Sequence, residues 1–206
     1  MSRAMASGEK TREQITKEIT EKWGLQKDKY ILFLARIVPE KGVHYLLEAF
    51  RGIDTDMKLV IAGGSSHSGE YMRQVMEMAA GDDRVIFTHF VQGRQLEELY
   101  SNAYCFVLPS DVEGMAISLL EAMSYGNCCV VSDIPENTEV IEDKAVSFRK
   151  GDAKDLRSKL SMLIEHPEIH AEYRKNASDF ICTKYNWDEV VRQTMEVYGC
   201  EDINGK

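Results

Sequence analysis

The sequence contains 206 residues, of which 44% are hydrophobic and 29% are charged, and its formal net charge at pH 7 is −9. This composition is typical of a soluble globular protein that can bury a sizeable core. The acidic charge argues against a nucleic-acid partner, because binding to a phosphate backbone needs a basic surface, and no apolar stretch approaches the roughly 20 residues that span a bilayer.

The chain begins with a predicted charged amphipathic helix over residues 11–23, which Gly24 closes. Short runs follow that are continuously apolar, the last of them weaker, and such runs are typical of strands covered on both faces. They span residues 30–35, 58–62, 84–88, 104–108, 128–132 and 145–148. Helical patterns lie between them, at residues 43–51, 68–80, 94–101 and 117–125. This alternation predicts an α/β fold with a doubly wound, parallel, six-stranded Rossmann-like sheet.

The residues after the last run predict a helical C-terminal annex. Asp152 is a candidate N-cap for its first helix, and Pro167 begins the second. The predicted helices span residues 156–165, 167 to about 183, and 186 or 187 to 198. We therefore expect an N-terminal helix with a flexible start over residues 1–29, a ligand-binding core over 30–150, and C-terminal helices that pack on the core over 151–206.

The cysteines and the first residues indicate the compartment. The five cysteines are odd in number and show no metal-like spacing, and three lie inside apolar runs, where a free thiol behaves as a small hydrophobe. These three are Cys105, Cys128 and Cys129. The first residues contain no apolar segment of a secretory signal. We therefore expect a reduced, cytoplasmic protein.

Charged residues and glycines follow the predicted strands at their carboxyl ends, where ligands bind in open α/β sheets. Arg36 and Lys41 flank the loop after the first strand. Gly63 and Gly64 follow the second strand, and paired glycines let a backbone approach a ligand closely. His89 follows the third strand. These residues are candidates for contacts with a small anionic ligand.

The segment after the fourth strand has the features of a diphosphate site. Glu113 precedes the expected helix, and residues 114–116 would present free N–H groups at its N-terminus, where anions bind. Glu121 would lie about 12 Å farther along the axis if the intervening residues were helical throughout. A diphosphate with a ribose alongside would span that separation, and a carboxylate can accept bonds from two ribose hydroxyls.

Each of these residues also has an ordinary structural explanation. Arg36 and Lys41 could be surface charges, and the glycine pair a turn. Glu113 could favour the helix dipole, and Glu121 could be an exposed helix residue. The sequence has no G-x-G-x-x-G after the first strand, no G-x-x-x-x-G-K-[ST], no G-x-S-x-G and no H-E-x-x-H. The histidines show no convincing ligand spacing, so we expect no metal site.

Taken together, three segments resemble the retaining glycosyltransferases of the GT-B fold, family 4, also called glycosyl transferases group 1. Residues 35–42 (ARIVPEKG) are similar to the family's G-R-x-x-x-x-K-G. Residues 84–99 (RVIFTHFVQGRQLEEL) resemble its V-x-F-x-G-x-V…L segment. Residues 113–126 (EGMAISLLEAMSYG) resemble its E-x7-E motif and the continuation E-A-M-A-x-G. The resemblance covers residues 30–198 and implies the C-terminal, donor-binding domain of such an enzyme.

The resemblance implies roles for the candidate residues in transfer of a sugar with retention, without a metal or cofactor. Arg36 and Lys41 would neutralise the donor diphosphate and stabilise the departing nucleoside diphosphate, and Glu113 would contact the donor sugar. Glu121 would hold the ribose, and the loop over residues 89–92 would lie beside the base. The implied substrate-binding residues are Gly63, Gly64, His89, Phe90, Val91, Gly114, Met115, Ala116, Ile117 and Glu121.

The resemblance also implies partners. A complete enzyme of this fold has a second, acceptor-binding N-terminal domain, and strand one begins near Tyr30 here. We expect this chain to bind a nucleotide sugar without transferring it at a meaningful rate, because half of the cleft is missing. The exposed face could be covered by the last helix or by a homodimer contact. Residues 113–127 also resemble family members of bacterial polysaccharide assembly, which implies a full-length enzyme at the inner face of the membrane.

Other interpretations stay open. The same fold serves nucleotide-sugar epimerases, and a non-catalytic nucleotide-sugar-binding subunit or sensor would need the same residues. A structural α/β domain without a ligand is a third alternative. Some positions depart from the family pattern: Ala35, His89 and Ala116 stand where glycine is usual, and Cys128-Cys129 replaces Pro-Val.

Overall fold

The computed structural model describes residues 17–64 and 69–186. The strands are β1 (Tyr30–Leu34), β2 (Lys58–Ala62), β3 (Val85–His89), β4 (Cys105–Leu108), β5 (Cys128–Ser132) and β6 (Val146–Phe148). The helices are α1 (Lys17–Trp23), the 3₁₀ turn η3 (Pro39–Lys41), α2 (Val43–Arg51), α3 (Gly69–Ala79), α4 (Arg94–Asn102), α5 (Ile117–Ser124), α6 (Pro135–Ile141), α7 (Ala153–Glu165) and α8 (Pro167–Lys184). The first part of the predicted N-terminal helix and nearly all of the predicted last helix lie outside the described residues.

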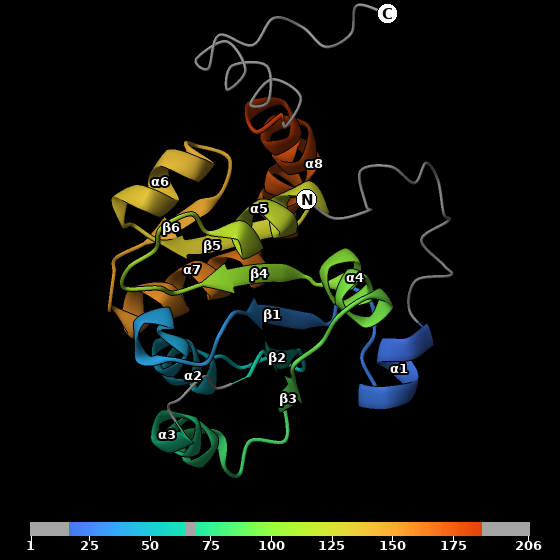
Figure 1. Cartoon of the computed structure of the whole chain (residues 1–206), viewed down its shortest axis with the longest axis vertical. Helices are drawn as coiled ribbons and strands as arrows, with labels where there is room; N and C mark the ends of the chain where they lie inside the picture. Colours follow the sequence, from blue (N-terminus) through green and yellow to red (C-terminus); the bar gives the residue numbers. More distant parts are fainter. Residues whose placement is uncertain (1–16, 65–68, 187–206) are drawn as a thin grey trace, which may run out of the picture.

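The six strands form one parallel sheet in the order β3-β2-β1-β4-β5-β6, with helices on both faces (Figure 1). The strand order turns around between β1 and β4, which come from the two halves of the doubly wound chain. At such a point the loops after two neighbouring strands diverge, and a crevice opens at their carboxyl ends. The predicted fold class, a six-stranded Rossmann-like sheet with a helical annex, is confirmed.

The two faces of the sheet bury alternate residues of each strand, which explains why the runs are continuously apolar. Ile31 and Phe33 face a core built with α2, α3 and α7. Tyr30 and Leu32 face a second core built with α1, α4, α5, α6 and α8. The edge strand β3 is the exception, because most of its side chains are only half-buried.

The helix boundaries follow the capping chemistry. Asp152 caps α7 as predicted: its Oδ1 accepts from the backbone N–H of Lys154 and of Asp155, each at 3.0 Å. The helix accordingly begins at Ala153 rather than at residue 156. The sequence did not predict α6, a 7-residue helix that begins at Pro135. Within the described ranges, no helix combines the length and apolarity that crossing a membrane requires.

A buried carboxylate on α4 connects that helix to α1. The Glu98 side chain on α4 is fully buried, and its Oε2 accepts from the backbone N–H of Glu18 at 3.0 Å and of Ile19 at 3.1 Å. Its other oxygen lies 3.0 Å from Arg94 Nε. The charge of Glu98 is therefore stabilised by helix amides and a guanidinium, which a buried carboxylate requires.

Candidate functional site

The loops that leave β1 and β4 touch at the carboxyl edge of the sheet. Gly42 has a φ of +67°, and a Cβ added there would lie 1.9 Å from the carbonyl oxygen of Pro109. The Asp111 N–H donates to the Glu40 carbonyl oxygen at 2.8 Å. Only a glycine permits this close approach, which brings the predicted cation of one loop against the predicted carboxylate of the other.

Lys41 and Glu113 form a largely buried ion pair. The Lys41 Nζ lies 2.6 Å from Glu113 Oε1, and the two side chains are 15% and 6% exposed. The buried Ser110 hydroxyl also donates to Glu113 Oε1, at 2.6 Å. Short, charge-assisted contacts of this kind fix the carboxylate in one orientation.

Glu121 projects from α5 and accepts a hydrogen bond from a buried tyrosine. The Tyr100 hydroxyl on α4 lies 3.1 Å from Glu121 Oε2, and the Tyr100 ring stacks on Tyr125 with centroids 5.4 Å apart. Burial raises the pKa of Tyr100 well above its usual range, and the Glu121 carboxylate adds to the effect. Tyr100 therefore stays protonated and acts as a hydrogen-bond donor to Glu121.

Arg36 is exposed at the same edge, and its side chain has no hydrogen-bond or ion-pair partner within the described residues, although its carbonyl oxygen accepts from Val38 N–H at 3.1 Å. It lies between two backbone contacts: Ala35 N–H donates to the Ala62 carbonyl oxygen at 3.2 Å, and Ile37 N–H to that of Gly64 at 3.0 Å. Gly63 has a φ of +143°, and a Cβ there would lie 1.9 Å from the Ala35 carbonyl oxygen. Arg36 is thus held at its backbone while its guanidinium is available to an anion.

The loop after β3 presents two of its three predicted contact residues. His89 is exposed, and Phe90 is 75% exposed. Val91 is 8% exposed and packs in the core on the α4 and α5 face, so its side chain does not reach the edge. The His89 carbonyl oxygen accepts from Gly63 N–H at 2.9 Å, which joins this loop to the one after β2.

The segment before α5 differs from the sequence-based expectation. Residues 113–116 are not helical, so the axial distance expected between Glu113 and Glu121 does not apply. The Ile117 N–H already donates to the Met115 carbonyl oxygen at 2.9 Å. The Gly114, Met115 and Ala116 amides have no partner among the described residues. The helix begins at Ile117, where the predicted helical pattern also begins, because Ala116, its N-cap residue, has a non-helical ψ of 75°.

Sequence reasoning missed the hydroxyls that support the two carboxylates. Ser110 lies in a loop and Tyr100 in an apolar helical stripe, and neither sequence pattern distinguishes a hydroxyl that contacts a carboxylate. A second polar pair also lies beside the site: His44 Nδ1 lies 2.7 Å from the Tyr71 hydroxyl, joining α2 to α3. Burial lowers the pKa of His44 and raises that of Tyr71 to about 12, so both groups are neutral at pH 7.

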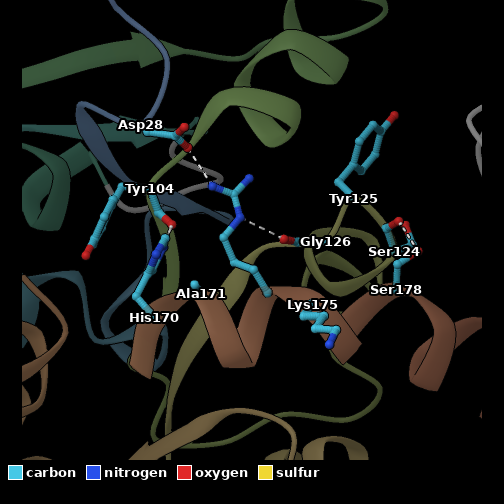
Figure 2. Close-up of a pocket in the computed structure, with 10 residues that line it drawn as sticks. Asp28, Tyr104, Ser124, Tyr125, Gly126, His170, Ala171, Lys175 and Ser178 are labelled. Atoms are coloured by element: carbon cyan, nitrogen blue, oxygen red, sulfur yellow. Dashed lines mark hydrogen bonds and ion pairs between the residues drawn. The ribbon is translucent and has the colours of Figure 1, made fainter. Parts of the chain in front are cut away.

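The opposite edge of the sheet carries a groove of about 690 Å³ between α8 and the residues that precede β1, β4 and β5 (Figure 2). Its polar groups are largely engaged with one another. Arg174 pairs with Asp28 at 2.6 Å and donates to the Gly126 carbonyl oxygen at 3.1 Å. His170 Nε2 lies 2.7 Å from the Tyr104 carbonyl oxygen (Figure 2). We interpret this groove as the seam that attaches α8 to the sheet.

No group of three or more histidine, cysteine, aspartate or glutamate side chains in residues 17–64 and 69–186 is arranged to hold a metal ion. The candidate charged residues at this side of the sheet are Arg36, Lys41, Glu113 and Glu121, of which Lys41 and Glu113 are in contact. The fold is thus that of the doubly wound α/β domains, which bind their ligands at the carboxyl edge of the sheet.

Comparison with known proteins gives the family. Residues 15–180 match the family model described as glycosyl transferases group 1. An uncharacterized glycosyltransferase of Methanocaldococcus jannaschii is 31% identical over 180 residues, which cover 85% of this chain and 46% of that protein. The O-antigen chain mannosyltransferase RfbU of Salmonella typhimurium is 27% identical over 165 residues, covering 80% of this chain and 45% of RfbU. The chain belongs to the glycosyl transferases group 1 family.

Solved structures agree on the fold. The crystal structure of Anabaena HepE in complex with UDP and glucose superposes with a TM-score of 0.84 at 18% identity, covering 93% of this chain and 53% of HepE. The chain spans about half the length of the curated relatives it matches, 46% and 45% of the two named above. The match to half of each relative therefore does not by itself give this chain the activity, substrates or partners of the complete proteins.

Proposed function

We propose that this chain is the donor-binding half of a retaining glycosyltransferase and that it binds a nucleotide-diphosphate sugar at the carboxyl edge of its sheet. The observation that carries the proposal is the largely buried pair of Lys41 and Glu113, beside an exposed Arg36. Arg36 lies in the same β1 loop as Lys41, and its side chain has no partner within the described residues. A diphosphate would accept from both cations, and Arg36 and Lys41 would stabilise the nucleoside diphosphate as it departs.

The remaining candidate residues would contact different parts of the donor. Glu113 would accept from hydroxyls of the donor sugar, and Glu121 from the ribose hydroxyls. The amides of residues 114–116 would contact phosphate or sugar oxygens, and the exposed His89 and Phe90 would lie beside the base. In this proposal the cations and amides neutralise the diphosphate, and no metal ion or cofactor is required.

The acceptor would bind to a second domain and not to the donor site of this chain. The relatives that match are about twice as long as the matched region, which supports a second domain in the complete enzyme. Several relatives carry names from polysaccharide assembly, such as the O-antigen chain mannosyltransferase of Salmonella typhimurium. We propose a polysaccharide-assembly role on the cytoplasmic side of the membrane, and we expect the present chain to bind donor without transferring sugar.

The test is a thermal-shift panel of UDP, GDP, ADP and dTDP, with UDP first because HepE was solved with UDP. A ligand at 100 times its dissociation constant should add about 2.7 kcal/mol of stability. Arg36→Ala and Glu121→Ala should abolish the gain from the nucleotide that binds. Lys175→Ala and Glu172→Ala are matched controls on the exposed surface of α8 and should retain it. If no nucleotide shifts the melting temperature, the chain does not bind a donor by itself and the proposal fails.

A further inference from the structure

Each of the two candidate carboxylates accepts a hydrogen bond from a buried hydroxyl. Ser110 is fully buried and Tyr100 is 1% exposed, so neither hydroxyl lies on the surface that a ligand would touch. Ser110 donates to Glu113 at 2.6 Å, and Tyr100 donates to Glu121 at 3.1 Å. The Tyr100 hydroxyl also lies 3.4 Å from the Ser118 carbonyl oxygen, but its shorter contact is with Glu121. Both hydroxyls would therefore act on a ligand through the carboxylates.

The contact with Ser110 fixes which oxygen of Glu113 faces a ligand. Glu113 Oε1 accepts from both Lys41 Nζ and Ser110 Oγ, each at 2.6 Å. Glu113 Oε2 has no partner within the described residues. With one oxygen occupied by two short bonds, the carboxylate cannot rotate freely, and the second oxygen remains available for hydroxyl donors.

The position of Ser110 is itself fixed by a hydrogen bond to its backbone. Its carbonyl oxygen accepts from the Ser132 hydroxyl at 2.5 Å, and that hydroxyl accepts from Asn137 Nδ2 at 3.1 Å. All three side chains are essentially inaccessible to solvent. This chain of bonds runs from α6 through the end of β5 to the loop after β4, so the position of Ser110 is set by the body of the domain.

Tyr100 supports Glu121 in a separate way. Its ring is fixed by the stacked Tyr125, and its hydroxyl comes from α4, not from the loop that carries Ser110. The bond occupies Glu121 Oε2. Glu121 and Glu113 are thus oriented by independent parts of the fold.

We propose that Ser110 and Tyr100 are positioning residues that divide donor recognition, a proposal that rests on the function proposed above. Ser110 orients Glu113 and so contributes to binding of the sugar moiety. Tyr100 orients Glu121 and so contributes to binding of the nucleoside. The two substitutions that remove these hydroxyls consequently have different signatures: one depends on the sugar being present, and the other does not.

The experiment is isothermal titration of the chain with UDP-glucose and with UDP, or with GDP-mannose and GDP, ADP-glucose and ADP, or dTDP-glucose and dTDP where the wild type selects that base. Loss of one charge-assisted hydrogen bond corresponds to about tenfold in affinity. Ser110→Ala should weaken the nucleotide sugar about tenfold and leave the nucleoside diphosphate within about twofold. Tyr100→Phe should weaken both ligands by the same factor, about tenfold.

Matched variants separate positioning from loss of structure. Glu121→Gln should reproduce the signature of Tyr100→Phe, and Glu113→Gln should weaken the nucleotide sugar. Ser110→Thr, which retains a hydroxyl but adds a methyl group at a fully buried position, should weaken the nucleotide sugar less than Ser110→Ala does. Ser178→Ala removes a hydroxyl that donates to the Ser124 carbonyl oxygen at 3.0 Å, away from the site, and should change neither affinity. Urea unfolding of each variant checks that the fold is intact.

The outcomes are distinguishable. Equal weakening of both ligands by Ser110→Ala, or no change with Ser110→Ala when Glu113→Gln does weaken the nucleotide sugar, overturns the role of Ser110. Weakening by Tyr100→Phe of the nucleotide sugar alone overturns the role of Tyr100. If the wild type binds neither ligand of any pair, the proposed function fails first, and this inference falls with it.

Discussion

The Lys41 ammonium lies 2.6 Å from Glu113 Oε1, although the two residues come from different loops and both side chains are largely removed from solvent. Removing one partner of such a pair leaves an uncompensated charge. We expect Lys41→Met to lower the free energy of unfolding by about 3 kcal/mol, and Lys41→Met with Glu113→Gln to cost less than the sum of the single changes. A double-mutant cycle by urea unfolding measures the coupling, and additive costs would contradict the ion pair.

Gly42, like Gly63, is a site glycine at which no side chain fits. Gly42→Ala would place a Cβ 1.9 Å from the Pro109 carbonyl oxygen at a φ of +67°. We expect a loss of at least about 2 kcal/mol in the free energy of unfolding. Gly69→Ala is the matched control, because nothing lies within 4 Å of the added carbon and its φ is not positive. Equal stability of the two variants in urea would show that the loops after β1 and β4 do not touch.

His89 adopts a left-handed conformation with a φ of +58°. The family pattern that residues 84–99 resemble has glycine here, and a positive φ suits glycine. His89→Gly should raise the free energy of unfolding by about 1 kcal/mol, because glycine adopts this φ without steric cost. His166→Gly, at an exposed C-cap with a φ of −122°, should not stabilise the protein. A lower melting temperature for His89→Gly would argue that the side chain makes contacts that outweigh the strain.

Stability should fall on mild acidification because of His170. This ring is buried against Tyr104, with ring centroids 3.8 Å apart, and burial lowers the pKa of His170 below its ordinary value. The unfolded chain, with an ordinary histidine pKa of about 6.5, then binds the proton more readily than the folded chain. The free energy of unfolding is therefore full above that pH and decreases as the pH falls below it.

Urea unfolding at pH 7.5, 6.5 and 5.5 checks this expectation. His170→Gln should reduce the decrease between the first and last pH values. Burial also lowers the pKa of His44, so His44→Gln should remove a further part, and the double variant should be the least sensitive. A wild-type stability that stays constant over this interval would show that neither ring resists protonation, and an unchanged decrease in His170→Gln would show that His170 does not contribute to it.

The strands could be predicted because burial on both faces of the sheet produces short runs of residues that are continuously apolar. Ile31 and Phe33 face one core, Tyr30 and Leu32 the other, so the run is apolar throughout. The helix α6 left no such signature: it has 7 residues and begins with proline, features that a loop also has. The candidate charges could be assigned to the carboxyl edge because parallel topology alone decides which loops share it.

The pairing within the site could not be predicted, because it depends on contacts between segments far apart in the sequence. Lys41 meets Glu113 only because Gly42 lies against Pro109. Tyr100 reaches Glu121 from another helix, and nothing in its apolar surroundings distinguishes it from a core residue. The irregular conformation of residues 113–116 depends on the fold around them, so helix geometry could not give the separation of Glu113 and Glu121.

The cysteines of the central strands can report on opening of the sheet. Cys105 and Cys128 are neighbours in the pairing of β4 with β5, and Cys129 is on the other face. Burial raises the pKa of Cys128 to about 12 and that of the other two well above the ordinary value, so all three are thiols at neutral pH. Since only an exposed thiolate reacts readily, the labelling rate of these side chains measures how often β4 separates from β5. These three native cysteines thus report how often the centre of the sheet opens, and no cysteine has to be introduced as a probe.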